Sequence, residues 1–448
     1  MTEPIHPEPE TKRSLRNNIY FKLGTIITII LLLLIPTQMI RGLIYEREWT
    51  QKEAIDEVSS KWAEEQTISG PFISIPYYKY VRESNGKDSS TKVVKLKEFL
   101  HILPTQLNVD GAINPEKRYR GIYEIVVYNS KLKISGNFND IDFSALDIRP
   151  EDILFDKAEF IVGINDLRGI EEQVNLKWND STIPFNSGVN SGDVVASGIN
   201  ADLDLKKSDS LQNNFELNLD LKGSQLLYFT PVGKVTDVNL KSPWSNPSFN
   251  GAFLPDNRAV TEAGFNANWN VLHLNRNFPQ IWTNSQFRID DSAFGIDLLL
   301  PVDNYQKSYR SIRYAILFIA FTFLVFFFIE VLNKVFIHPV QYILVGVALI
   351  VFYTLLLSIS EHLKYNIAFA ISAVATMLLI AGYVRAILKS GKLTALIVGI
   401  LSVLYTFIFV IIQVQDYALL FGSIGIFLIL ALVMYFSRKI NWYEMSLN

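Results

Sequence analysis

The ionisable side chains of this sequence form no recognisable catalytic or metal-binding pattern. The chain has no cysteine, which excludes disulfides, thiolate metal ligands and cysteine nucleophiles together. Its histidines are scattered, with no i, i+4 pair and no carboxylate at metal-ligand spacing; they are His6, His101, His273, His338 and His362. The sequence also lacks a G-x-S-x-G elbow and a phosphate-cradling glycine loop. We therefore expect no enzymatic activity, no metal and no cofactor.

Two small groups of charged residues at predicted membrane edges remain as candidates for a functional site. Glu361 and His362 separate one pair of apolar segments, and Asp416 separates another. If both breaks lie at the exported edge, these three side chains meet there, either as ordinary solvated loop residues or as a proton or ion relay. Glu330 and Lys334 are four residues apart at the cytoplasmic edge, so we expect them to pair on one helix face.

The elements that must position these residues are long apolar segments, which predict six transmembrane helices. A helix needs about 20 mostly apolar residues to span roughly 30 Å of hydrocarbon. The uncharged C-terminal segments are 314–329, 335–360, 365–384, 393–415 and 417–437. Segment 23–40 follows a positively charged flank and lacks a small-residue cleavage site, so it predicts an uncleaved signal anchor. The alternative is a buried soluble core, but such cores rarely contain so many consecutive apolar segments.

The region between the anchor and the C-terminal segments alternates apolar with polar residues, which predicts β-strands. In 215–222, Phe215 and every second residue after it are apolar, while the residues between them are polar. The same period recurs at 199–206 and 265–271. One apolar and one polar face for each strand indicate an antiparallel sandwich or barrel-like sheet.

Several local expectations accompany the β prediction. Residues 41–65 carry one apolar stripe at helical spacing, which predicts a polar helix after the anchor, either a stalk or surface-lying helix or a helix packed on the domain that follows. Hairpins are expected across Asn129-Ser130 and across 222–224. The Ser-, Gly- and Asn-rich interval 181–198 leaves open whether the β region has one lobe or two. His273 continues the apolar face of a predicted strand, so we expect it to be a hydrogen-bonded core histidine.

Together these elements predict a membrane α+β protein, with one N-terminal anchor, a five-helix C-terminal bundle and a large exported antiparallel β-rich domain. The expected domains are a cytoplasmic tail at 1–18, an anchor at 19–40, an exported periplasmic domain with an N-terminal helix at 41–313, a bundle at 314–437 and a cytoplasmic tail at 438–448. Lys and Arg beside alternate spans place both termini in the cytoplasm. Basic residues that flank the exported domain disagree, but long translocated domains escape this rule.

Composition restricts the class of partner. The net charge is −3 and no basic run is present, so we expect no nucleic-acid partner. With 448 residues the chain is too long for one core and must contain several domains.

Along most of its length the chain resembles the CreD family of bacterial inner-membrane proteins linked to cell-envelope integrity. The matching segments include 70–72 (GPF), 223–226 (GSQL), 229–233 (FTPVG), 242–249 (SPWSNPSF), 251–255 (GAFLP), 338–342 (HPVQY), 358–362 (SISEH), 415–420 (QDYALL) and 441–443 (NWY). The resemblance implies an envelope-maintenance protein tied to a two-component stress regulon. It implies no assigned reaction and no catalytic residues.

Two functional hypotheses follow. In the first, a non-enzymatic inner-membrane protein supports envelope integrity and the stress response, and its exported domain binds a periplasmic or cell-wall partner. In the second, the C-terminal bundle is a small-solute transporter or channel, although few charges lie in the membrane and no repeat relates two halves. A lipid-modifying enzyme is a weaker third hypothesis, since no nucleophile or metal signature is present. The sequence does not determine the oligomeric state.

Overall fold

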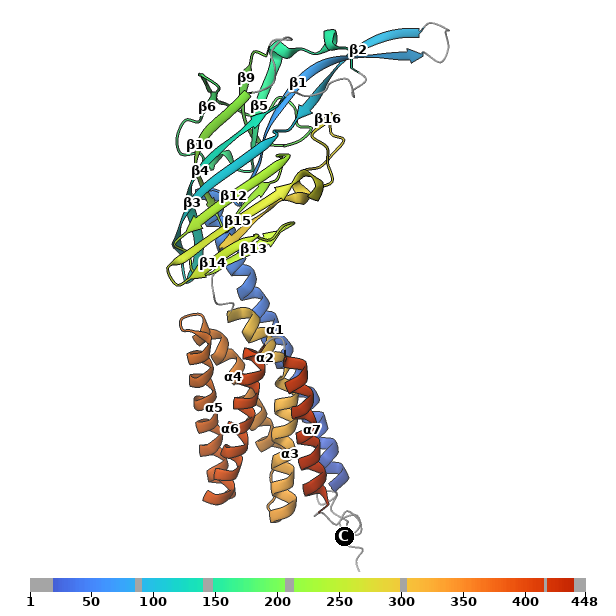
Figure 1. Cartoon of the computed structure of the whole chain (residues 1–448). Coiled ribbons are helices and arrows are strands. Elements are labelled where there is room, and N and C mark those ends of the chain that lie inside the picture. The colour runs from blue at the N-terminus through green and yellow to red at the C-terminus, as the bar shows by residue number, and fades with distance from the viewer. Residues whose placement is uncertain are drawn as a thin grey trace, which may run out of the picture. The chain divides into compact units, whose positions relative to one another are not determined.

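The computed structural model describes residues 19–84, 91–139, 148–205, 213–298, 304–414 and 417–438 (Figure 1). The chain divides into two compact units. The helical unit is Met1–Thr50 with Val302–Asn448, and the β unit is Gln51–Pro301. The boundary between them falls inside the first helix, α1 (Ile19–Trp62), which therefore supplies residues to both units.

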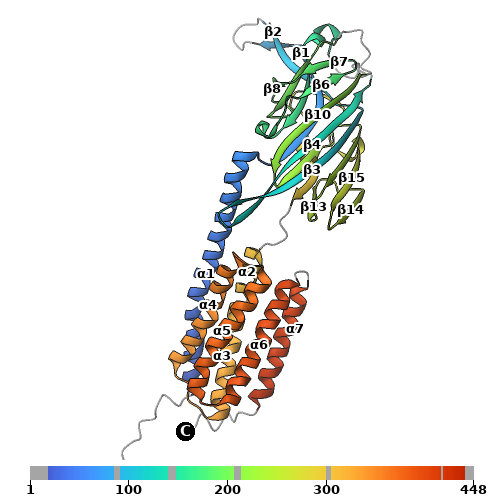
Figure 2. The ribbon, with the colours of Figure 1, turned by 90° about the vertical axis from the view of Figure 1, so that its left-hand side faces the viewer.

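The helical unit consists of long apolar helices and a short polar one, which pack side by side (Figure 2). Besides α1, they are α2 (Asn304–Arg313), α3 (Ala315–Asn333), α4 (Pro339–Ser360), α5 (Tyr365–Leu388), α6 (Gly391–Gln413) and α7 (Ala418–Ser437). In the described part of the chain, α1 and α3 to α7 are the 6 helices long and apolar enough to cross a membrane. The predicted number of spans is thus confirmed. Helix α2, with 10 residues, is too short to span a membrane, and it was not among the predicted elements.

Helix α1 is one continuous element of 44 residues, which joins the predicted anchor (19–40) to the predicted helical stretch after it (41–65). Pro36 lies inside it without ending it, and the neighbouring Thr37 hydroxyl donates to the Leu33 carbonyl at 2.8 Å. No proline occurs between Pro36 and Trp62, so every residue of this interval keeps the N–H that a helix needs. The anchor and the helical stretch after it therefore form one helix, which ends at Trp62.

Capping residues form the short breaks between α3 and α4 and between α5 and α6. The His338 ring accepts a backbone N–H at the start of α4, and the Gln341 side chain accepts the N–H of His338 in return. At the start of α6 the Ser390 hydroxyl accepts the Leu393 N–H. Helices α3 and α5 end at Lys334 and Lys389, which adopt left-handed backbone with φ of 54° and 46°. Each cap ends or begins a helix within a few residues, so the breaks stay short.

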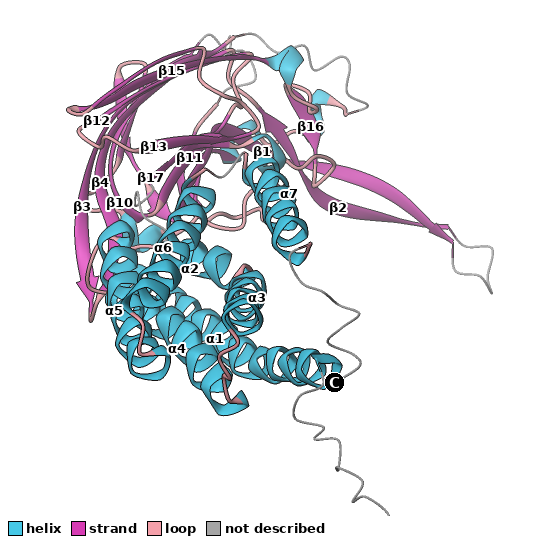
Figure 3. Cartoon of the chain, turned by 90° about the horizontal axis from the view of Figure 1, so that it is seen from below, coloured by secondary structure: helices cyan, strands magenta, loops and turns pink. Residues whose placement is uncertain are grey.

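The β unit contains two large sheets. Sheet A has the order β13-β17-β11-β1-β5-β9-β8, and β2 pairs with both β1 and β16. Its strands are β1 (Gln66–Ser84), β2 (Thr91–Ile102), β5 (Ala158–Ile164), β8 (Asn186–Ser187), β9 (Gly198–Leu203), β11 (Leu226–Thr230), β13 (Pro247–Gly251), β16 (Ile281–Thr283) and β17 (Phe294–Leu298). In Figure 3 the far ends of β1 and β2 extend beyond the other strands of the unit.

Sheet B has the order β14-β15-β12-β3-β4-β10-β6-β7. Its strands are β3 (Gln106–Arg120), β4 (Tyr123–Phe138), β6 (Asn175–Trp178), β7 (Ser181–Pro184), β10 (Asn213–Ser224), β12 (Val235–Ser242), β14 (Asn257–Thr261) and β15 (Gly264–Leu272). Alternation of buried and exposed residues along β10 and β15 confirms the period-two pattern of the sequence.

The two sheets share one hydrophobic core. Phe160 of sheet A lies among aromatic rings of sheet B, with ring centroids 5.3 Å from Phe215, 5.9 Å from Trp178 and 6.2 Å from Phe138. Such edge-on packing buries large apolar surfaces of both layers together. The interval 181–198 contains β7 of sheet B and β8 of sheet A, so it connects the two sheets.

The strand connections differ from the sequence-based expectation in several places. Most strand pairs are antiparallel, but β1–β11 and β3–β12 are parallel, so both sheets are mixed. The hairpin predicted across Asn129-Ser130 is wrong, because β4 runs through it and the buried Ser130 hydroxyl donates to the Leu221 carbonyl of β10. The hairpin predicted across 222–224 is also wrong. Strands β10 and β11 belong to different sheets, and the chain passes between them at Gln225, whose φ is 62°.

The prediction that His273 is a core histidine is also wrong. His273 lies in a short 3-10 turn after β15 and is only half-buried. The alternation ends at Leu272, so the face predicted for His273 does not continue beyond the strand. The fully buried histidine of the described chain is instead His101 in β2.

Candidate ligand-binding trough

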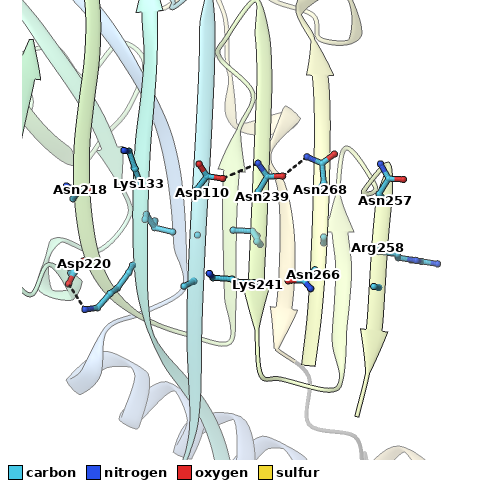
Figure 4. Close-up of a pocket in the computed structure, with 17 residues that line it drawn as sticks. Asp110, Lys133, Asn218, Asp220, Asn239, Lys241, Asn257, Arg258, Asn266 and Asn268 are labelled. Atoms are coloured by element: carbon cyan, nitrogen blue, oxygen red, sulfur yellow. Dashed lines mark hydrogen bonds and ion pairs between the residues drawn. The ribbon is translucent and has the colours of Figure 1, made fainter. Parts of the chain in front are cut away.

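The outward face of sheet B carries a row of polar side chains that crosses the sheet from β10 to β14. Register pairing places each member opposite the next, in the order Asn218, Lys133, Asp110, Asn239, Asn268 and Asn257. Directly paired residues point to the same face of a sheet. The Asn239 amide donates to Asp110 at 3.1 Å, and the Asn268 amide donates to Asn239 at 2.7 Å (Figure 4). The middle of the row is therefore held in place by its own hydrogen bonds.

A second row lies two residues further along the same strands. Its members are Asp220, Lys131, Ala112, Lys241, Asn266 and Ala259. Ala112 and Ala259 are small, so the surface is hollow between the longer side chains. The hollow has a volume of about 820 Å³ and is lined by both rows. We call the surface formed by these two rows the trough.

The floor of the trough depends on one glycine. A Cβ atom added to Gly111 in β3 would lie 2.6 Å from a methyl carbon of Leu240 and 3.0 Å from one of Leu132. Both leucines are buried on the inner face of the sheet. Because interiors are closely packed, any side chain at Gly111 would push these neighbours apart. Glycine thus lets β3 lie flat between β4 and β12 beneath the trough.

The cations of the trough differ in how they are paired. Lys133 forms an ion pair at 3.0 Å with Glu216, which does not line the hollow. Lys131 lies 3.8 Å from Asp220, and 76% of its side chain is exposed. Within the described chain, Lys241 makes no ion pair or side-chain hydrogen bond, and its row neighbours Ala112 and Asn266 are uncharged. An exposed pair at this distance is weak, so Lys131 and Lys241 keep most of their capacity to bind an anion.

Two smaller hollows extend the trough. One of about 420 Å³ shares Ala112, Lys241, Ala259 and Asn266 with it. The other, of about 180 Å³, shares Asn218 and Asp220. Lys241 therefore lies where two hollows meet, and the recessed surface is long rather than round.

This arrangement is suited to binding. It offers amide donors and acceptors in fixed positions and ammonium groups at the side, which recognise a polar ligand. Within the described ranges, no three His, Asp or Glu side chains lie together as a metal site would require. The signal that points to the trough in the sequence is the run Asn266, Asn268 and Asn270, whose even spacing places three amides on one face.

The structure gives Glu330 a different partner from the expected one. Its carboxylate is 6% exposed, forms an ion pair with Lys22 of α1, and accepts hydrogen bonds from the Ile337 N–H at 2.9 Å and the Tyr342 hydroxyl at 3.0 Å. Lys334 caps α3 with an exposed side chain, and its pairing with Glu330 stays a prediction. Sequence spacing along one helix cannot reveal a partner on α1.

The second predicted cluster is described only in part. Glu361 ends α4, accepts a hydrogen bond from the Tyr305 hydroxyl of α2 at 3.2 Å, and lies 3.7 Å from the Arg47 guanidinium of α1. His362 follows in an exposed turn. Asp416 lies outside the described residues, so its meeting with Glu361 and His362 stays a prediction. The partners of Glu361 come from elements that the sequence analysis placed in the exported domain.

A buried polar group lies in sheet A, away from the trough residues. The His101 ring is fully buried between Phe72 and Trp282, with ring centroids 6.0 Å and 5.7 Å away. Its Nε2 atom lies 3.6 Å from a carboxylate oxygen of Asp193. Burial lowers the pKa of His101 to about 4, and the nearby Asp193 only partly opposes this. His101 is therefore neutral at pH 7.

Comparison with known proteins places this architecture in a family. The profile described as "Inner membrane protein CreD" matches residues 18–443. A curated relative, inner membrane protein CreD of Escherichia coli (strain K12), is 32% identical over 440 residues, which are 97% of this chain and 96% of the relative. Solved structures of an M1 zinc metallopeptidase from Deinococcus radiodurans align with 38% to 44% of this chain and 38% to 42% of theirs, at 9% identity. Their TM-score of 0.19 is too low to indicate a shared fold or function.

Proposed function

Because this chain belongs to the CreD family of inner membrane proteins, we propose that it supports cell-envelope integrity and the envelope-stress response without catalysing a reaction. In this proposal the β unit is exported to the periplasm and acts as a binding module. Its partner is a component of the periplasm or the cell wall, and the trough is the surface that contacts it.

The trough is the observation that carries this proposal. Its polar side chains come from strands of one sheet with a shared core, so their spacing is fixed before a ligand arrives. Pre-organised groups lose little conformational freedom on binding, which favours affinity. The binding groups are amides and ammonium groups. These groups form hydrogen bonds and ion pairs with a ligand, but none of them is an activated nucleophile that could attack a substrate bond.

The proposed orientation has both termini in the cytoplasm and about residues 41–313 outside. Its support is the excess of Lys and Arg at alternate helix ends, such as Arg385 in the last turn of α5 and Lys389 at its C-cap. Single cysteines at Asn186 and Ser390 test it cleanly, because the chain has no cysteine of its own. A membrane-impermeant thiol reagent should label the first from outside and the second only in opened cells. Labelling of both from outside would contradict the orientation.

The binding role is tested by filling the trough. The Ala112→Trp substitution places a large ring in the hollow, and Thr182→Trp places the same ring on the exposed strand β7 of the same sheet as a control. A null strain should tolerate envelope-directed stress less well. Wild type and the Thr182→Trp variant should restore tolerance, whereas Ala112→Trp, folded and inserted at normal levels, should not.

Full rescue by the filled variant would show that the trough is dispensable. The absence of catalysis has its own test, in which purified protein is incubated with membrane lipids and cell-wall fragments. Hydrolysis or group transfer that a single substitution abolishes would overturn the non-enzymatic part of the proposal.

A further inference from the structure

The chemistry of the trough also indicates what kind of ligand it binds; this inference rests on the proposed function. Lys131 and Lys241 lie on either side of Ala112, on the two strands that flank β3. Neighbouring strands are about 4.8 Å apart, so the two lysine backbones are roughly 10 Å apart. Two flexible ammonium groups at that separation can both reach one anionic group seated over Ala112.

The carboxylates nearby leave this position open to an anion. Asp110 is occupied by the Asn239 amide at 3.1 Å, and it lies in the other row. Asp220 lies 3.8 Å from Lys131, on the side away from Lys241. The centre of the second row, from Ala112 to Ala259, contains one cation and no carboxylate. An anion there is attracted by both lysines, and the single negative charge of Asp110 in the other row opposes this only in part.

The amides of the trough identify the rest of the ligand. Asn239, Asn266, Asn268 and Asn257 lie on three neighbouring strands and present both donors and acceptors to the hollow. The rows run across the strands, so the matching ligand is elongated in that direction. A peptide that extends a sheet lies along an edge strand and bonds to its backbone, which is a different geometry.

The lining also argues against an apolar ligand. Among the described residues that line the main hollow there is no aromatic side chain, and its leucines belong to the inner face. Acyl chains and protein hot spots bind where aromatic and apolar side chains gather. A ligand rich in hydroxyl and amide groups fits this surface better.

We propose that the trough binds an anionic glycan, laid across the strands, with one carboxylate or phosphate held between Lys131 and Lys241 over Ala112. The amides bind the hydroxyl and acetamido groups of the sugar units on either side. Two sources in an envelope carry this chemistry, namely the cell-wall glycan with its stem-peptide carboxylates and the phosphorylated sugars of a glycolipid.

Binding to the full-length protein in lipid nanodiscs tests the proposal. The probes are a muropeptide oligosaccharide with free carboxylates, the same compound with its carboxylates amidated, a phosphorylated oligosaccharide released from lipopolysaccharide, and an acidic peptide of equal charge. At least one anionic oligosaccharide should bind, and the one that binds identifies the source. Lys241→Gln and Lys131→Gln should each weaken it about fivefold, as expected for one exposed ionic contact. Lys177→Gln, an exposed lysine on β6 outside the trough, should have no effect.

Each other outcome contradicts a different part of the argument. Equal binding of the amidated compound would overturn the anion position while leaving the trough as a binding site. Binding of only the acidic peptide would overturn the glycan. If no probe binds and Ala112→Trp also restores stress tolerance, both this inference and the proposed binding role fail.

Discussion

The helical unit and the β unit place charged side chains in opposite environments. In the helical unit, the Glu330 carboxylate is 6% exposed and has an ion-pair partner and two hydrogen-bond donors. In the trough of the β unit, Lys131 is 76% exposed and its one carboxylate is 3.8 Å away. Breaking a buried pair leaves a costly uncompensated charge, whereas an exposed pair contributes little. The Glu330–Lys22 pair therefore maintains the structure, whereas Lys131, in its weak pair with Asp220, remains available to a ligand.

The largest effect is expected at Glu330. The Glu330→Gln substitution removes the counter-charge of Lys22 and places an amide where two donors already point. We expect the full-length protein in detergent to lose about 3 kcal/mol of stability, measured by thermal or denaturant unfolding. Adding Lys22→Met should recover part of the loss, because it removes the unpaired charge. A loss below about 1 kcal/mol would mean that the Glu330–Lys22 pair contributes no more than an exposed ion pair, which would contradict the difference between the two units.

Protonation of His101 provides a test of how much a buried charge destabilises the β unit. Its pKa is about 4 in the folded protein and 6.5 when unfolded, so the unfolded chain binds the proton first. Stability should therefore fall as the pH falls from 6.5 towards 4, by about 3 kcal/mol in total from this residue. Tryptophan fluorescence during unfolding of the full-length protein follows the change.

The informative quantity is the difference between wild type and His101→Gln. Carboxyl groups titrate in the same range, including Glu159, whose pKa is raised by burial. The Gln variant keeps these groups but has no imidazole to protonate. An equally steep loss of stability in both proteins below pH 6.5 would show that His101 is not the cause.

Glu361 is expected to lie between the two extremes. It is partly exposed, and Arg47 is 3.7 Å away, so Glu361→Gln should cost about 1 kcal/mol. Combining it with Asp416→Asn in a double-mutant cycle tests whether these residues meet at one membrane edge. A coupling above about 0.5 kcal/mol would support the predicted cluster. Additive effects would show that Asp416 does not interact with Glu361, whose partners are then Arg47 and Tyr305.

The smallest effect on stability is expected at Lys241. Its side chain is exposed and has no partner in the described chain, so Lys241→Gln should change the free energy of unfolding by less than about 0.5 kcal/mol. The same variant should still lose binding of the anionic probe. A clear loss of stability would mean that Lys241 supports the sheet rather than a ligand.

The sequence alone determined the spans and the class of fold. Hydrophobic length is a property of consecutive residues, and so is the alternation that makes a strand such as β10. For the same reason the anchor, the bundle and the β-rich region between them were predicted correctly, and the matching motifs led to the right family. Expectations about where a strand ends or turns back were less successful, as with His273 and both hairpins.

Contacts between side chains from distant segments of the chain became visible only in the folded structure. The trough exists because register aligns Asn218 with Lys133, Asp110 and then three asparagines from strands far apart in the chain. A shift of one residue in any of these strands would send its side chain to the other face. The pairing of Glu330 with Lys22 likewise needs α1 to come within side-chain reach of α3, which no local pattern encodes. Contacts between distant segments are set by packing and register, so the site emerged only when the sheets and helices were assembled.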